Sequence, residues 1–550
     1  MRIALIQSNP VTGALRDNMQ ALVQAVLRAS ELGADLCIAP ELALCGHNIG
    51  DWLLRAGFAE ACRKELEVGA ARLAEVPNAS PLLLGAPVAN PVPQGKRLQN
   101  CAVLVHKGEV AVLSRKILLP SDGIHDDARY FEPGVACGVL HCKGWRLAVT
   151  VGEDMWNDRI FWQGNRNFAL DPVEELMKAG GADALLNITA LPYEQELPEM
   201  HRRMLAHTAV RYRVPVLSAN LVGGNDGLVY YGGSVAVNEN GGMITCAPLF
   251  KEAVSVADIP GGRHEETIPE PSREEELWQA IVLGTRDYAR KCGFSGAVLG
   301  LSGGVDSALV AAIAAEALGP EHVIGILMPS PFSSAGSLDD SRNLAGKLGI
   351  QTHTLPISSI LENFERSFDE VFPGSFAGLV KENTQARIRG SLLMAYANRF
   401  NALLLTTGNK SESAVGYATL YGDMAGGIGP IGDLYKRQVY SLCRWYNSLR
   451  PGVIPEEILT KAPSAELAPG QKDEDSLPPY DILDAILYEF TENRKNVAQL
   501  ANEGYDRALV EGVSAMMQKA EFKRSQAAPA LHLSSRGFGR EWRFPIAVRT

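Results

Sequence analysis

The sequence predicts an α/β protein of two domains, of which the second contains a doubly wound parallel sheet. Its 550 residues are enough for two or three domains of ordinary size. In residues 1–258 predicted strands alternate with both hairpins and helices, which is typical of a layered α/β domain. In residues 274–550 apolar strands alternate regularly with helices, which indicates a parallel sheet. Residues 259–273, rich in Pro, Gly and Glu, are predicted to link the two domains.

The composition is that of an ordinary enzyme rather than of a nucleic-acid-binding or membrane protein. Hydrophobic residues make up 46% of the chain and charged residues 21%, and the formal net charge is −11. A negative charge disfavours binding to nucleic acids or anionic membranes, and no apolar run approaches the ~20 residues of a membrane span. The first residues are predicted to form a strand rather than a signal peptide. Nine dispersed cysteines without a Cys-x-x-Cys pair predict reduced thiols in a cytoplasmic protein, with no disulfide framework or zinc site.

Apolar periodicity predicts the elements of the first domain. The helix over 17–32 is amphipathic and ends at Gly33, and the turn 106–109 joins the two strands of a hairpin. The other expected helices are 59–76, 172–179 and 198–213, and the expected strands are 3–8, 36–40, 82–87, 101–105, 146–151 and 183–189.

The stretch 296–307 is predicted to be a buried strand followed by a tight phosphate-binding loop. The apolar strand ends in a Ser-Gly-Gly turn, and a long Ala-rich helix follows until Gly319. Two adjacent glycines let the backbone approach a ligand closely, and the loop N–H groups with the helix N-terminus attract an anion. No Gly-Lys-Ser/Thr is present, so this is not the loop that binds a γ-phosphate with a lysine. Asp306 suits this loop if a divalent cation lies between it and the phosphates.

The later strands of the second domain are expected to end at the same ligand site. Ligands of doubly wound sheets bind beside the carboxyl ends of the strands, so the loops after Leu301, Met328 and Thr407 should share one site. The segment Ser337–Asp340 looks like a capping box that opens a helix. The expected strands are 322–328, 351–355 and 402–407, and the expected helices are 273–291, 337–348 and 382–400.

The phosphate loop, Ser-Gly-Gly-Val-Asp-Ser, resembles the pyrophosphate-binding loop of the N-type ATP pyrophosphatases. Members of that superfamily cleave ATP between the α and β phosphates and adenylate a carboxylate or a carbonyl. Further segments extend the resemblance to the NAD synthetase family, and the two-domain order matches its glutamine-dependent bacterial form. These segments are Glu382–Gly390, Thr407–Glu412, Gly416–Asp423 and Glu521–Arg524.

The resemblance to NAD synthetases implies ATP-dependent amidation of deamido-NAD to NAD. ATP would adenylate the nicotinate carboxylate and release pyrophosphate, and ammonia would then displace AMP. Asp306 and Glu412 would share Mg²⁺ as catalytic residues, and Lys410 and Lys436 would stabilise phosphate charge. The implied ATP-binding residues are Gly300, Leu301, Ser302, Gly303, Gly304, Val305, Asp306, Ser307 and Thr407, and the implied deamido-NAD-binding residues are Asn383, Arg387, Glu412 and Lys523.

Several of these residues also have an ordinary structural role open to them. Arg387 and Arg389 could form a solvated helix face, Lys523 could be a charge near the chain end, and Glu412 could cap a helix. Two predicted loops, Ser464–Pro479 and 525–529, could close over the substrates and exclude water.

Segments of the first domain resemble the carbon–nitrogen hydrolase, or nitrilase, family. Pro40-Glu41-Leu42 matches the segment that holds the general base of that family, and Arg115-Lys116-Ile117 begins the match to the segment that holds its catalytic lysine. The resemblance implies an α-β-β-α sandwich. The other matching segments are 129–134, 187–193 and 220–224.

The residue at the nucleophile position of that family is a glycine. The family's cysteine follows a strand in a context like Cys-Glu-Asp-Ile-Trp, whereas this chain has Gly152-Glu-Asp-Met-Trp. Leu191 stands in place of a serine, and Gly227 and Tyr231 stand in place of acidic residues. Since glycine has no side chain to attack an amide, the domain is predicted to be glutaminase-inactive, with its general base and lysine left as a buried ion pair.

The resemblances together imply an NAD synthetase that uses ammonia and acts as a homo-oligomer. One alternative is glutamine-dependent synthesis by a working glutaminase domain with another nucleophile. A further hypothesis, which is compatible with the use of ammonia, keeps catalysis in the second domain and gives the first domain the role of an assembly scaffold. Other ATP pyrophosphatases are disfavoured: the nitrilase-like domain argues against a GMP synthetase, and the lack of paired cysteines argues against a tRNA-thiolating enzyme.

Overall fold

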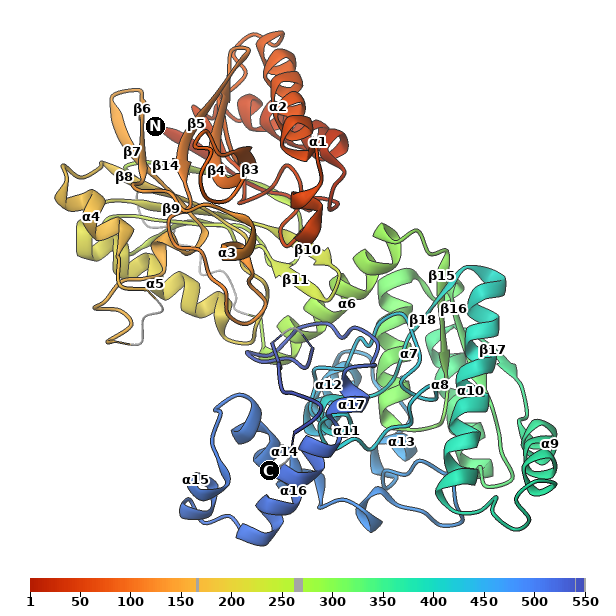
Figure 1. The fold of residues 1–550 in the computed structure, drawn as a ribbon. Helices are drawn as coiled ribbons and strands as arrows, with labels where there is room; N and C mark the ends of the chain where they lie inside the picture. Colours follow the sequence, from red (N-terminus) through yellow and green to blue (C-terminus); the bar gives the residue numbers. More distant parts are fainter. Residues whose placement is uncertain (165–167, 262–270, 540, 549–550) are drawn as a thin grey trace. The chain divides into compact units, whose positions relative to one another are not determined.

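The computed structural model describes residues 1–164, 168–261, 271–539 and 541–548, which form two compact units (Figure 1). Unit 1 comprises Met1–Asn225 and Val229–Pro271, and unit 2 comprises Asp226–Leu228 and Ser272–Thr550. Most of the predicted linker, residues 262–270, lies outside the described residues.

Two six-stranded sheets and one hairpin account for the strands of unit 1 within the described residues. The strands are β1 (Arg2–Gln7), β2 (Leu36–Ile38), β3 (Leu82–Ala89), β4 (Leu98–His106), β5 (Glu109–Arg115), β6 (Gly138–Cys142), β7 (Trp145–Val151), β8 (Ala184–Thr189), β9 (Val216–Asn220), β10 (Val222–Asn225), β11 (Leu228–Tyr231), β12 (Val235–Val237), β13 (Met243–Cys246) and β14 (Ala253–Asp258). The first sheet has the order β14-β1-β2-β3-β4-β5, the second has the order β13-β12-β9-β8-β7-β6, and β10 pairs with β11. The helices are α1 (Leu15–Glu31), α2 (Phe58–Ala74), α3 (Asp127–Tyr130), α4 (Pro172–Lys178) and α5 (Leu197–Tyr212), with 3₁₀ helices at Gly50–Leu54 and Gly152–Met155.

Side-chain alternation along these strands produces four layers, because successive residues of a strand point to opposite faces of the sheet. In β1, Leu5 packs between the two sheets, whereas Ile6 packs with residues of α1 and α2. In β7, Val149 packs between the sheets, whereas Ala148 packs with residues of α4 and α5. Unit 1 is therefore an α-β-β-α sandwich, which confirms the fold that the nitrilase resemblance implied.

Unit 2 is built on a parallel sheet of four strands within the described residues, in the order β17-β16-β15-β18. The strands are β15 (Gly296–Gly300), β16 (Val323–Leu327), β17 (Gln351–Thr354) and β18 (Ala402–Leu404). The helices are α6 (Arg273–Lys291), α7 (Val305–Leu318), α8 (Ala335–Leu348), α9 (Ser358–Asp369), α10 (Leu379–Phe400), α11 (Lys410–Val415), α12 (Lys436–Leu449), α13 (Glu456–Thr460), α14 (Tyr480–Thr491), α15 (Val497–Asn502), α16 (Arg507–Lys519) and α17 (Glu521–Arg524), with 3₁₀ helices at Pro320–His322 and Asp473–Asp475.

Helices cover both faces of this sheet (Figure 1). Val298 and Ile326 pack with residues of α9 and α10, whereas α7 packs against β15 and β16. The predicted doubly wound parallel sheet is thus confirmed. β18 ends earlier than the expected residue 407, because Thr406 N donates to Ile428 O at 3.0 Å instead of continuing the ladder.

The N-terminal end of α8 differs from the sequence prediction. Ser334, not Ser337, is the N-cap residue, and its Oγ accepts a hydrogen bond from Ser337 N at 3.1 Å. The predicted capping box is therefore wrong by three residues, since a helix can begin at whichever nearby hydroxyl the backbone orients toward its first turn.

None of the helices in the described part of the chain is long and apolar enough to cross a membrane. All nine cysteines lie in that part and are free thiols.

Candidate functional site

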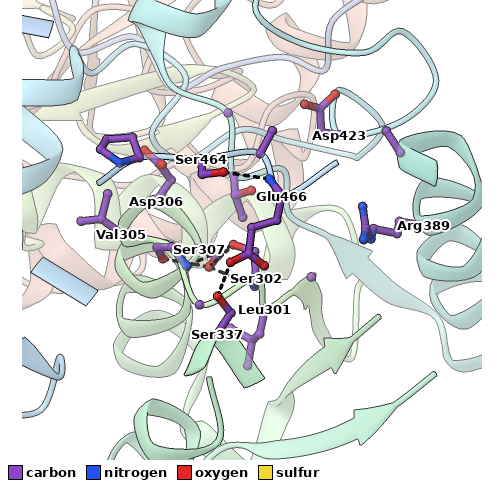
Figure 2. A pocket seen from close by; sticks show the side chains of 18 of the residues that line it. Leu301, Ser302, Val305, Asp306, Ser307, Ser337, Arg389, Asp423, Ser464 and Glu466 are labelled. Carbon is purple, nitrogen blue, oxygen red and sulfur yellow. Dashed lines mark hydrogen bonds between the residues drawn. The ribbon is translucent and has the colours of Figure 1, made fainter. Parts of the chain in front are cut away.

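A cavity of about 280 Å³ opens at the carboxyl ends of β15, β16 and β18 in unit 2 (Figure 2). Leu301, Met328 and Thr407, after which the sequence predicted three converging loops, all line it. The residues predicted to bind ATP line it without exception: Gly300, Leu301, Ser302, Gly303, Gly304, Val305, Asp306, Ser307 and Thr407.

Glycine and two serine hydroxyls determine the shape of the phosphate loop. Gly303 has a φ of +78°, and a Cβ there would lie 2.5 Å from the backbone oxygen of Ser337. Ser302 Oγ lies 3.1 Å from Ser307 Oγ and accepts a hydrogen bond from Gly304 N at 3.2 Å. Gly304 is the N-cap residue of α7 and has no capping side chain, so the N–H groups of the first turn are left for an anionic ligand.

Lys436 lies between two carboxylates on the cavity wall. Its Nζ lies 2.6 Å from Asp306 Oδ2 and 3.2 Å from Glu412 Oε1. Asn409 holds both acids: its Nδ2 donates to Asp306 Oδ1 at 2.9 Å, and its Oδ1 accepts from Glu412 N at 3.0 Å. Burial alone would lower the pKa of Lys436, but the charges of Asp306 and Glu412 raise it, so this lysine is a cation. Burial raises the pKa of Glu412, and Lys436 opposes that shift.

Glu412 combines the two roles that the sequence left open. Its Oε2 accepts from Asn409 N at 3.3 Å and closes a capping box on α11, while its Oε1 contacts Lys436. The cap therefore fixes the carboxylate at the cavity and does not exclude a ligand role.

Asp473 is a third acid on this wall, and the sequence analysis did not identify it. It lies in the predicted loop Ser464–Pro479 and is buried. Tyr480 Oη donates to Asp473 Oδ2 at 2.9 Å, and Lys436 Nζ lies 5.2 Å from the centroid of the Tyr480 ring. Burial raises the pKa of Asp473, and Lys436 opposes that shift. The surrounding run of Pro, Asp and Glu has no apolar periodicity, so no signal in the sequence marked this residue as buried.

The same loop also contacts the N-terminal end of α8, where Glu466 Oε1 accepts from Ser337 Oγ at 2.6 Å. Lys461, which precedes the loop, donates from Nζ to Ser337 Oγ at 3.0 Å. Figure 2 shows Glu466 beside Ser337, and all three residues line the cavity. None of the three was predicted to be a site residue, because the contacts join segments that are more than a hundred residues apart.

The residues implied for deamido-NAD form two groups. Glu412 lines the cavity, whereas Asn383, Arg387 and Lys523 do not and instead surround the loop Gly416–Asp423. Each of these three makes hydrogen bonds of 2.7–3.2 Å to that loop. Burial lowers the pKa of Lys523. Part of the loop lines the cavity, so the two groups are neighbours.

Arg387 and Arg389, both on α10, do not share one solvated face. Arg387 is exposed, whereas Arg389 lines the cavity and donates from Nε to Met328 O at 3.1 Å. Residues two apart lie about 200° apart around a helix, so only one of them can face solvent. Burial lowers the pKa of Arg389.

Lys410 does not line the cavity, and the expectation that it stabilises phosphate charge is wrong. Its side chain is fully buried, with Nζ 2.9 Å from Asp433 Oδ1 and 2.7 Å from Glu492 Oε1. It also donates to Ser534 Oγ at 2.7 Å. The first residue of α11 thus points into the protein, and its charge is neutralised there.

In unit 1, Glu41 and Lys116 form a buried ion pair. Lys116 Nζ lies 2.8 Å from Glu41 Oε1 and 2.5 Å from Asp127 Oδ2, and Asn100 Nδ2 donates to Glu41 Oε1 at 2.7 Å. Burial raises the pKa of Glu41, and Lys116 opposes the shift. Burial would lower the pKa of Lys116, but Asp127 and Glu41 raise it. Asp127, on α3, was not predicted.

Gly152 lies directly beside this ion pair. A Cβ at Gly152 would lie 2.5 Å from Glu41 Oε2 and 2.8 Å from Lys116 Nζ. Its φ of +51° falls in the left-handed region, which favours glycine. The structure thus brings together three positions that the nitrilase resemblance singled out, from segments far apart in the sequence.

Two further positions singled out by that resemblance are buried. Leu191 is buried, and its N–H donates to Asn220 Oδ1 at 2.8 Å. Tyr231 is also buried, and its Oη lies 2.9 Å from His201 Nδ1. Gly227 lies in the turn between β10 and β11.

Comparison with known proteins agrees with the division of the chain into two units. Residues 2–268 match the carbon–nitrogen hydrolase family, and residues 277–527 match the NAD synthase family. A glutamine-dependent NAD(+) synthetase from Synechocystis sp. is 46% identical, covering 99% of this chain and 98% of that protein. One from Thermotoga maritima is 39% identical, covering 100% of this chain and 99% of that protein.

A solved structure has the same architecture. The glutamine-dependent NAD+ synthetase from Acinetobacter baumannii, in complex with adenosine diphosphate, superposes with a TM-score of 0.77 at 35% identity and covers 99% of this chain and 98% of that one. Because the similarity to these relatives extends over nearly the whole length of both chains, it includes both units. The chain belongs to the family of two-domain NAD synthetases, ligases that form a carbon–nitrogen bond.

Proposed function

We propose that the chain converts deamido-NAD to NAD in two steps at the cavity of unit 2. A nicotinate carboxylate oxygen attacks the α-phosphorus of ATP, and pyrophosphate leaves. The lone pair of ammonia then forms a bond to the carboxyl carbon, the C–O bond breaks with its electrons leaving on AMP, and the nitrogen loses its extra proton. The observation that carries this proposal is the arrangement of residues 300–307 and Thr407 around one cavity, because such a loop stabilises a departing pyrophosphate.

Asp306 and Glu412 are proposed to hold Mg²⁺. Their oxygens already converge on one cation, the Nζ of Lys436, and Mg²⁺ is commonly bound through one or two carboxylates together with substrate phosphates. When bound, the ion would neutralise charge on the leaving pyrophosphate. Lys436 would supply a second positive charge at the same wall.

Arg387, Asn383 and Lys523 are proposed to bind deamido-NAD through the side of the loop Gly416–Asp423. Two of these residues are cations, and the substrate is an anion. Burial lowers the pKa of Lys523, so an anionic ligand beside it would stabilise the charged lysine.

The nitrogen donor distinguishes two versions of this function. The names of the relatives, which are glutamine-dependent synthetases, favour glutamine and hence support the alternative better than the ammonia reading. One observation favours free ammonia for this chain: Gly152 lies beside Glu41 and Lys116. If this position is that of the catalytic cysteine, as we propose, unit 1 retains a base and a cation but has no nucleophile.

The boundaries of the domains follow from the same proposal. Residues 1–258 form a nitrilase-like domain without glutaminase activity, 259–273 a linker, and 274–550 the synthetase domain. The division into two compact units supports these limits.

Initial rates of NAD formation test the proposal, at saturating ATP and deamido-NAD in ammonia-free buffer with either ammonium or glutamine added. Ammonium should support turnover. Glutamine should give no rate above background, because loss of a catalytic nucleophile removes on the order of 10⁶-fold in rate. Robust glutamine-driven NAD formation with matching glutamate release would establish the alternative. Failure of both donors, without pyrophosphate release, would contradict the synthetase chemistry itself.

A further inference from the structure

Three cations line the cavity of unit 2 among the described residues, and one of them has no acidic partner there. Lys436 lies between two acids, and Lys461 forms an ion pair with Asp340 at 2.8 Å. Arg389 donates from Nε to Met328 O at 3.1 Å and forms no ion pair in the described part of the chain. A half-buried guanidinium without a counter-charge indicates a site for an anionic group of a ligand, because buried charges require pairing.

The terminal nitrogens of Arg389 are open to the cavity. They have no hydrogen-bond partner among the described residues, yet neither is enclosed by protein atoms. Burial lowers the pKa of Arg389, and the charges of Glu466 and Asp423 oppose that shift. Both of these acids are held by other groups: Glu466 Oε1 accepts from Ser337 Oγ at 2.6 Å, and Asp423 Oδ1 accepts from Thr419 N at 2.6 Å. A ligand can therefore reach the guanidinium without breaking an ion pair.

Arg389 lies where the cavity meets the residues proposed to bind deamido-NAD. Helix α10 packs directly against the loop Gly416–Asp423, since a Cβ at Gly390 would lie 2.8 Å from a backbone oxygen of that loop. Arg387 contacts this loop from outside the cavity, whereas Arg389 lines the cavity. Figure 2 shows Arg389 on the opposite side of the cavity from Asp306 of the phosphate loop. The guanidinium is thus placed for an anion that enters beside the loop Gly416–Asp423.

We propose that Arg389 binds the nicotinate carboxylate of deamido-NAD and directs it at the α-phosphorus of ATP. The inference rests on the proposed amidation, in which the phosphate loop, Lys436 and Mg²⁺ already match the charge of the phosphates. The carboxylate is the reacting anion that still lacks a partner, and a guanidinium binds a carboxylate through two parallel hydrogen bonds that fix its orientation. The amide product has no such charge, so this contact distinguishes the acid from the amide.

Equilibrium binding of deamido-NAD and NAD tests the proposal, because these dinucleotides differ only in the carboxylate that the amide replaces. Mg²⁺ and α,β-methylene-ATP are present, so that the ATP site is filled and no pyrophosphate leaves. Arg389→Gln should raise the Kd of deamido-NAD by about 10- to 100-fold, the usual range for a hydrogen bond to a charged group, and leave the Kd of NAD within about twofold. Arg389→Lys keeps the charge but not the planar fork, so it should raise the Kd of deamido-NAD less.

Arg399→Gln is the matched control, because Arg399 is an exposed arginine of the same helix. This variant should bind both dinucleotides as wild type does. Equal weakening of deamido-NAD and NAD in Arg389→Gln would overturn the proposal and leave Arg389 the role of supporting the loop Gly416–Asp423. Weaker binding of the ATP analogue alone would overturn it in favour of a contact with ATP, and unchanged binding of all three ligands would exclude Arg389 from the site.

Failure of the proposed function is distinguishable from failure of this inference. The former would appear in the wild-type protein, as absence of pyrophosphate release with ATP and deamido-NAD. The inference alone fails if the wild type releases pyrophosphate and Arg389→Gln keeps the wild-type preference for deamido-NAD over NAD. Thermal denaturation checks that each variant folds, and Arg389→Lys decides the question if Arg389→Gln does not fold.

Discussion

Asp306 is the acid of the phosphate loop, and its carboxylate contacts Lys436 and Asn409 across the cavity. Asp306→Ala removes a proposed Mg²⁺ ligand. We expect pyrophosphate release to fall by about 10²- to 10³-fold, the usual cost of losing one group that stabilises developing charge. The fold should persist because Lys436 retains its contact with Glu412. Single-turnover pyrophosphate release and thermal denaturation measure the two effects.

Asp339→Ala is the matched control for this prediction. Asp339 is exposed on α8 and contacts only Arg342 on the same helix among the described residues, with a separation of 3.4 Å. This variant should release pyrophosphate as wild type does. A normal rate in Asp306→Ala would exclude Asp306 from adenylation.

Gly152→Cys tests whether one substitution restores amide hydrolysis. The new side chain would meet Glu41 Oε2 and Lys116 Nζ at less than van der Waals distance, with φ in the left-handed region. We expect a loss of stability of about 1–3 kcal/mol and little or no glutamine-driven NAD formation. Thermal denaturation and glutamate release are the measurements.

Gly152→Ala separates the loss of stability in Gly152→Cys from the effect of its thiol. It should be destabilised to a similar degree, because its Cβ meets the same atoms, but it offers no thiol. If the cysteine variant alone forms NAD from glutamine as fast as from ammonium, the pocket of unit 1 has not drifted and the prediction is wrong.

Helix α11 has six residues, too few to be stable by itself, and buried charges hold it in place. Its first residue, Lys410, is bound by Asp433 and Glu492. Lys410→Met would leave both carboxylates buried without their cation, which typically costs about 3–5 kcal/mol. We expect a lower melting temperature together with lower synthetase activity, since the helix also carries Glu412.

The pH dependence of stability tests whether the loss of the buried charge pairs destabilises Lys410→Met. Burial would raise the pKa of Asp433, but Lys410 and His532 lower it. The ionised Asp433 therefore stabilises the fold above the unfolded pKa of about 3.9, and this stabilisation disappears as pH falls through the folded pKa. In Lys410→Met the unpaired carboxylates favour protonation. The difference in unfolding free energy between wild type and variant should therefore shrink on acidification. An unchanged difference from pH 8 to about pH 3 would point to lost packing instead.

The four strands of the parallel sheet and the longest helices could be predicted from local pattern, whereas β9–β14 and α12–α17 were not predicted. Helix α6 begins and ends at the predicted residues because Ser272 caps it and its apolar spacing is regular. The start of α8 was misplaced because several serines there could serve as caps. Loop Ser464–Pro479 was predicted from composition, but its contacts with α8 could not be.

Four apolar side chains on α9 and on the residues that follow it are exposed. Phe364, Val371, Phe372 and Leu379 are each more than half exposed. Exposed apolar side chains are common at protein interfaces, and we expect a homo-oligomer at micromolar concentration. Light scattering measures the mass, and Phe372→Glu combined with Leu379→Glu should lower it. A wild-type monomer would contradict the prediction.

The sequence by itself determined the class of the protein and its phosphate loop, because strand, turn and helix signals are local and the Ser-Gly-Gly turn requires glycine for steric reasons. The tertiary structure decided which side chains act together. Lys410 and Lys436 are both buried and each lies between two acids, yet only Lys436 lines the cavity. The burial of Asp473 and the crowding at Gly152 likewise depend on segments distant in sequence. Burial and charge pairing are properties of the packed chain, and no local pattern encodes them.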